Sequence, residues 1–160
     1  ETGPTAYYVL KVANRLGIDT YVSTRSQKNI EAAKKAGAVW AADASKKDLP
    51  CKLDKSIVFP PAGNLVEPAL EKLEVGGILV LAPVSMSTIE IKNYSQNLWG
   101  RDIRTLFNIK RSWGEEFLNI ADEMQIKVGK EVFPFEKLQD VLILARKGEI
   151  KEPNAVIKIG

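Results

Sequence analysis

Apolar strand patterns alternate with helical patterns along most of the chain, and this alternation limits the fold more than any other feature. Ile78-Leu79-Val80-Leu81 is apolar at every position, as a parallel strand covered on both faces requires. The other strand patterns cover residues 18–23, 39–42, 56–59 and 103–107, and helical patterns cover residues 4–16, 27–36, 64–73 and 93–99. This order predicts an α/β fold, a doubly wound parallel sheet with a ligand crevice outside the carboxyl ends of its strands.

The pattern changes after Phe107, and the remaining residues are expected to form a different packing unit. Helical patterns cover residues 112–123 and 136–146, and strand patterns cover residues 130–133 and 154–159. We interpret this tail as a C-terminal α+β segment.

The strand pattern that ends at Ser23 is followed by Thr24-Arg25-Ser26, with Lys28 a turn later. A dinucleotide-binding fold places the adenosine ribose at this strand end, where an acidic residue favours a free 2′-hydroxyl. A neutral Thr followed by Arg instead favours a phosphate on that oxygen. We therefore predict that Thr24, Arg25, Ser26 and Lys28 select NADP(H), with NAD(H) as the alternative. The competing interpretation is a solvated loop whose Ser26 only caps a helix.

Gly3, Pro4 and Thr5 open the first helical pattern. Free amides and the helix dipole at such a terminus attract a pyrophosphate, although Pro4 is also typical of an ordinary first helical position. Pro60 and Ala62, after the strand at residues 56–59, are predicted to touch the adenosine side of a cofactor through backbone groups. Two prolines and a glycine are equally typical of any strand exit.

Composition excludes several classes of site. The 160 residues include one cysteine, Cys51, and no histidine, so neither a Cys and His zinc shell nor a histidine-assisted nucleophile can form within this sequence. We assign no catalytic and no metal-ligating residue. The net charge of +3 is spread over lysines that alternate with glutamates, which argues against nucleic acid as a partner. No apolar stretch is long enough to span a bilayer and no signal peptide is recognisable, so we expect a cytoplasmic protein without a membrane partner.

Several motifs, in order and spacing, resemble the second half of the medium-chain, zinc-type alcohol dehydrogenases. They are Gly3-Pro4-Thr5-Ala6, Thr24-Arg25-Ser26, Gly37-Ala38, Val58-Phe59-Pro60-Pro61-Ala62-Gly63, Gly76-Gly77-Ile78-Leu79-Val80-Leu81, Leu98-Trp99-Gly100 and Gly114-Glu115-Glu116-Phe117-Leu118. The resemblance implies a Rossmann-like NAD(P)-binding domain over residues 1–106. It also implies a segment over residues 107–160 that returns to a catalytic domain absent from this sequence.

The resemblance further implies where the nicotinamide lies and what the full-length protein does. Pro83, Val84 and Ser85 follow the family's fifth cofactor-domain strand and would approach the nicotinamide and its ribose, as would Phe107 and Asn108 at the next strand end. Core packing and a polar turn are the alternatives for Phe107 and Asn108. The family implies hydride transfer between NADP(H) and an alcohol or aldehyde, zinc held only in the absent catalytic domain, and a homo-oligomer at full length. This chain alone is expected to be inactive.

The family's first strand has no counterpart here, and Glu1 stands where the first glycine of its phosphate-binding turn is expected. In the strand order 3-2-1-4-5-6 that strand is central, so the strands at Tyr21 and Val58 should not pair with each other. We expect the chain to be a fragment of a longer polypeptide whose preceding residues supply the strand. Two other functions remain open at this point: a zinc-independent quinone reductase of the same superfamily, and a non-catalytic dinucleotide-binding module.

Overall fold

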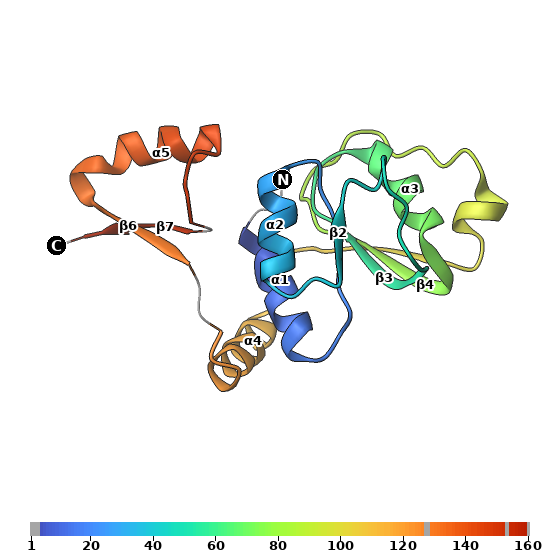
Figure 1. Ribbon diagram of the computed structural model, residues 1–160, viewed down its shortest axis with the longest axis horizontal. Coiled ribbons are helices and arrows are strands. Elements are labelled where there is room, and N and C mark those ends of the chain that lie inside the picture. Colours follow the sequence, from blue (N-terminus) through green and yellow to red (C-terminus); the bar gives the residue numbers. More distant parts are fainter. Residues whose placement is uncertain (1–3, 127–128, 153, 160) are drawn as a thin grey trace.

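The computed structural model describes residues 4–126, 129–152 and 154–159, and Figure 1 shows their arrangement. The helices and strands are α1 (Pro4–Arg15), β1 (Tyr21–Ser23), α2 (Gln27–Lys35), β2 (Trp40–Ala42), β3 (Leu53–Val58), α3 (Val66–Glu71), β4 (Leu73–Leu81), β5 (Asp102–Thr105), α4 (Arg111–Glu123), β6 (Lys130–Pro134), α5 (Leu138–Lys147) and β7 (Asn154–Lys158). Short helical turns cover Gly63–Leu65, Tyr94–Leu98 and Phe135–Lys137.

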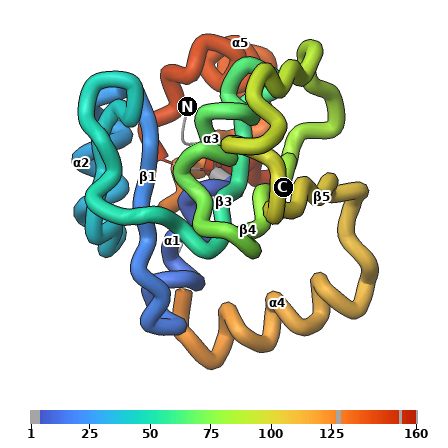
Figure 2. Tube along the Cα trace, turned by 90° about the vertical axis from the view of Figure 1, so that its right-hand side faces the viewer, coloured from blue at the N-terminus to red at the C-terminus, as the bar shows by residue number. Residues whose placement is uncertain are grey.

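The strands before residue 106 form two parallel sheets. β1 pairs with β2, and β3, β4 and β5 pair in that order. Strand β1 therefore does not pair with β3, as expected for a doubly wound sheet without its central strand. Figure 2 shows β1 and α2 on one side of this view and β3 and β4 further across. The α/β fold with parallel strands is confirmed.

Each sheet packs against its own helices. One buried cluster joins Leu10 of α1, Ala33 of α2 and Ala41 of β2. The other joins α3, β3 and β4, where Leu70, Leu73 and Leu79 are completely buried. The apolar faces of the helices therefore stabilise two sheets around two separate clusters.

The boundary between α3 and β4 differs from the expectation. Residues 64–73 were predicted to be one helix, but α3 ends at Glu71 and Leu73 already pairs with Leu53 of β3. Pro68 lies in the first turn of α3, where its missing N–H costs no helical hydrogen bond.

The expected Gly-Gly turn before residue 78 lies inside β4. The pairing shifts from Leu53 with Leu73 to Lys55 with Ile78, so several residues of β4 bulge out between these pairs. Gly76 has a φ of 84°, and a Cβ on Gly77 would lie 2.9 Å from the carbonyl oxygen of Glu74. Glycine is required at both positions, because one needs left-handed backbone and the other a close approach.

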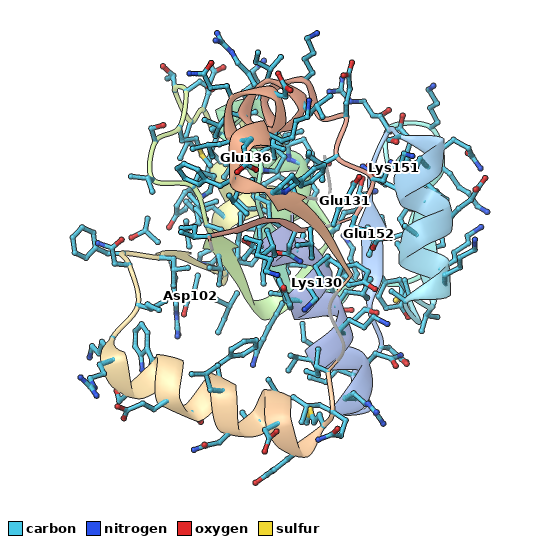
Figure 3. The ribbon with its side chains drawn as sticks, turned by 90° about the vertical axis from the view of Figure 1, so that its left-hand side faces the viewer. Asp102, Lys130, Glu131, Glu136, Lys151 and Glu152 are labelled. Carbon is cyan, nitrogen blue, oxygen red and sulfur yellow. The ribbon has the colours of Figure 1, made fainter. Side chains whose placement is uncertain are left out.

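The C-terminal residues form a separate β-α-β unit, set apart in Figure 1. β6 and β7 pair in parallel, α5 connects them, and the N–H of Lys151 donates to Glu131 over 3.3 Å. Helix α4 has no buried residue and stands away from the sheets in Figure 3, which also labels Glu131 and Lys151. None of the helices in the described ranges has the length and apolar character needed to cross a bilayer.

Candidate functional site

Most of the candidate residues lie just beyond the carboxyl ends of the parallel strands. In the three-stranded sheet, Val58 is level with Leu81, and Leu81 is level with Thr105. The pairing continues past the strand ends, because the N–H of Ala82 donates to the carbonyl of Val58 over 3.0 Å and the N–H of Leu106 donates to Leu81 over 3.1 Å. The loops that begin at Phe59, Ala82 and Leu106 therefore leave the sheet from one edge.

The end of β1 is held against the end of β2. The N–H of Thr24 donates to the carbonyl of Ala42 over 3.0 Å. The Ser26 hydroxyl caps α2 by accepting from the N–H of Asn29 over 3.4 Å. Capping is thus a confirmed role of Ser26, and its hydroxyl hydrogen can still donate to another group. Arg25 and Lys28 are exposed beside it.

The sequence interpretation did not select one acidic side chain, Asp43, whose charge interacts with that of Arg25. Asp43 directly follows β2, and it accepts hydrogen bonds from the Ser45 hydroxyl over 2.7 Å and the Ser45 N–H over 3.0 Å. These bonds, and more weakly the charges of Lys46 and Arg25, lower the pKa of Asp43. Its position directly after a strand was the sequence signal that could have identified it.

Of the residues expected near the nicotinamide, all but Pro83 are exposed to solvent. Val84 is fully exposed, and Phe107 is 89% exposed, so Phe107 does not pack in a core. Asn108 has a φ of 48°, a left-handed conformation that asparagine tolerates better than most residues. Pro83 is half-buried at the base of this loop, and Ser85 is exposed.

The other candidate residues are at a helix start and in a turn. Helix α1 begins at Pro4, and Thr5 is exposed in its first turn, whereas Gly3 lies outside the described residues. The N–H of Ala62 donates to the carbonyl of Pro60 over 2.8 Å, so this turn uses one of its own backbone donors. Contacts of these residues with a cofactor stay predictions.

A contact network missed by the sequence interpretation fixes the segment that follows β4. A single carboxylate oxygen of Glu67 accepts from the N–H groups of Lys92 and Asn93, over 2.9 and 3.0 Å, and from the Asn97 amide over 2.8 Å. The hydrogen bonds from Asn93 and Asn97 are the main reason that the pKa of Glu67 is lowered. These partners are 25 to 30 residues from Glu67 in sequence, so no local pattern indicates them.

Metal-binding side chains do not gather in the described ranges. Over these residues, no group of three or more His, Cys, Asp or Glu side chains could hold a metal ion. Cys51 is a free, exposed thiol. The chemistry that the described site offers is therefore binding by cations, hydroxyls, backbone groups and exposed apolar surface.

The chain is similar in sequence to a curated protein, although no family model matches it. It is 35% identical over 133 residues to a probable alcohol dehydrogenase, AdhA, of Mycobacterium tuberculosis, in an alignment that covers 82% of this chain and 38% of that protein. The chain thus spans well under half the length of this curated relative.

Solved structures share the fold at lower sequence identity. A cinnamyl alcohol dehydrogenase of Sorghum bicolor matches with a TM-score of 0.81 and 21% identity, over 98% of this chain and 45% of that one. The CAD of Helicobacter pylori, solved with NADP(H), matches with a TM-score of 0.78 and 16% identity, over 98% and 46% of the two chains. These matches establish the fold.

Proposed function

We propose that this chain is the C-terminal, cofactor-binding part of an NADP(H)-dependent enzyme of the medium-chain, zinc-type alcohol dehydrogenases. At full length, that enzyme would transfer a hydride between NADP(H) and an alcohol or aldehyde. Residues 1–106 would bind the cofactor, and residues 107–160 would return to the catalytic domain.

The observation that carries the proposal is the common position of the candidate residues. Except for those at the start of α1, they follow the carboxyl ends of parallel strands, which is where doubly wound sheets bind dinucleotides. The groups present also suit the cofactor. Arg25 and Lys28 are exposed cations beside two hydroxyls, a donor set that fits a phosphate, and Val84 and Phe107 offer exposed apolar surface for a ring.

We assign the work of binding to these side chains. Arg25 and Lys28 would neutralise the 2′-phosphate, and the hydroxyls of Thr24 and Ser26 would donate to its oxygens. The N-terminus of α1, with Thr5, would face the pyrophosphate. Pro83, Val84 and Ser85 would orient the ring from one loop, and Phe107 and Asn108 from the next.

The chemistry itself belongs to groups outside this sequence. When bound, the nicotinamide gives or accepts the hydride. We assign the zinc expected for the family to the catalytic domain, where it would polarise the substrate oxygen. The chain alone should therefore bind cofactor without turnover.

Titration calorimetry on the 160-residue chain tests the proposal. We expect NADP(H) to bind more tightly than NAD(H). Equal affinities would overturn selection for the 2′-phosphate, while a chain that binds neither nucleotide would overturn the cofactor-binding function as a whole.

A further inference from the structure

The segment between β4 and β5 includes the loop that we assign to the nicotinamide. Residues later in this segment form hydrogen bonds with Glu67 of α3. We infer that Glu67 is a positioning residue, which holds this segment so that residues 83–85 face the nicotinamide half of the cofactor. The inference rests on the proposed function. It adds a residue that affects cofactor binding but is not among the cofactor contacts assigned above.

The segment is long and has little regular structure of its own. Residues 82–101 contain a single helical turn, Tyr94–Leu98, and Val84, Ser85 and residues 87–90 are exposed. A loop of this kind gains a fixed shape only from contacts with the body of the protein, because its own backbone would otherwise remain free.

Polar contacts at two places hold the segment against the body of the protein. Near β4, the Ser87 hydroxyl accepts a hydrogen bond from the N–H of Gly63 over 2.9 Å. The backbone of Thr88 lies so close to Gly63 that a side chain at position 63 would clash with it. Farther along, the three donors on Lys92, Asn93 and Asn97 converge on Glu67. Met86, next to the first of these places, and Ile91, next to the second, add apolar contacts with the core cluster.

The contact at Glu67 is built to be specific. Glu67 and Asn93 are half-buried, and Asn97 is only 7% exposed, so the donors of Asn93 and Asn97 would be left poorly hydrated if they lost their acceptor. The Asn93 side chain in turn caps the helical turn by accepting from the N–H of Gln96 over 3.2 Å. One carboxylate therefore fixes both the end of the loop and the turn that follows it.

A comparison of two ligands separates positioning from simple binding. We expect Glu67→Ala to weaken binding of NADP(H) to the 160-residue chain by roughly 10-fold, because the loop no longer holds its shape. The same variant should bind 2′,5′-ADP, which lacks the nicotinamide half, within about twofold of the unmutated chain. Amide hydrogen exchange over residues 84–97 should become faster, a readout that needs no ligand.

Glu71→Ala is the matched control. Glu71 lies one turn further along α3, and its carboxylate contacts the Asn97 amide only over 3.4 Å. This variant should keep the affinity for both ligands. Glu67→Gln retains the shape of the side chain and should show a smaller loss for NADP(H), which provides a second folded variant should Glu67→Ala unfold.

The outcomes distinguish the inference from the function on which it rests. If the unmutated chain binds neither ligand, the proposed function fails and this inference falls with it. If the unmutated chain binds both, and Glu67→Ala weakens them equally or weakens neither, the cofactor function stands and the positioning role is wrong. Unchanged hydrogen exchange over residues 84–97 would also overturn it.

Discussion

Two carboxylates, Asp43 after β2 and Glu67 in α3, have lowered pKa values through hydrogen bonds with neighbouring donors. At Asp43 the hydroxyl and N–H of Ser45 contribute most, and the cations Lys46 and Arg25 add to them. At Glu67 the backbone of Asn93 and the amide of Asn97 dominate. Both groups therefore stay anionic at neutral pH, one beside the proposed phosphate site and the other under the loop after β4.

Under the proposed function, the choice between NADP(H) and NAD(H) depends on Arg25. Arg25→Ala should weaken NADP(H) binding by about 10-fold, because a charge-assisted contact with the 2′-phosphate is lost. NAD(H), which lacks that phosphate, should change by less than about twofold. Titration of both cofactors measures this. Arg146→Ala, on the exposed side of α5, is the control for loss of a positive charge. Equal weakening of both cofactors by Arg25→Ala would contradict the assignment.

The lowered pKa of Glu67 makes its contribution to stability dependent on pH. A group whose pKa is lower in the folded state stabilises the fold above its unfolded pKa, which is ordinarily 4.5, and loses this effect as the pH falls through the folded value. The difference in Tm between the unmutated chain and Glu67→Gln should therefore be constant from about pH 7 to about pH 6 and shrink below about pH 4. Thermal unfolding followed by circular dichroism measures it. A Tm difference that grows as the pH falls would contradict a lowered pKa for Glu67.

Gly63 and Gly114 differ in how closely other parts of the chain approach them. A Cβ on Gly63 would lie 2.1 Å from the carbonyl oxygen of Thr88, which is backbone and cannot turn aside. A Cβ on Gly114, inside α4, would meet only the Ile109 side chain at 3.9 Å. Substitution of glycine by alanine should therefore have opposite effects on stability at these two positions.

Gly63→Ala should destabilise the protein by about 1–3 kcal/mol, because the segment at residues 87–88 must move to admit the methyl group. Gly114→Ala should stabilise it by about 0.5–1 kcal/mol, because alanine is the better helix former in an open position. Denaturant unfolding of both variants gives the two free energies. If Gly63→Ala left the free energy of unfolding unchanged, residues 87–88 would be able to move away from position 63 without a loss of stability.

Sequence patterns predicted the features that depend on neighbouring residues in the sequence. They missed the features that depend on contacts between residues far apart in the sequence. The strand end at Ser23 and the cap at Ser26 were predictable, because a β-rich run, a hydroxyl and a helical period follow one another. Leu73 was assigned to a helix because its spacing suits one, yet its pairing with Leu53 places it in β4. The contacts of Glu67 join residues that are far apart in the sequence, so helical or strand periodicity cannot predict them.

At the scale of the whole molecule, the two sheets with their helices form two units whose buried clusters share no residue. Leu10, Ala33 and Ala41 belong to the first, and Leu70 and Leu79 to the second. The proposed cofactor would contact both, because Arg25 follows β1 and the residues near the nicotinamide follow β4 and β5. Cofactor binding should therefore couple units that have little shared core of their own.

Truncation of one core residue in each unit tests this division. Leu70 is completely buried and Leu10 is 4% exposed, so Leu70→Ala and Leu10→Ala should each cost about 2–5 kcal/mol in the unit that contains the residue. Without cofactor, hydrogen exchange should become faster in α3, β3 and β4 for Leu70→Ala, and in α1, α2 and β2 for Leu10→Ala. Saturating NADP(H) should slow exchange in both units of either variant, because the ligand binds only when both strand ends are formed. Faster exchange throughout the chain in either ligand-free variant would mean that the two sheets unfold as one.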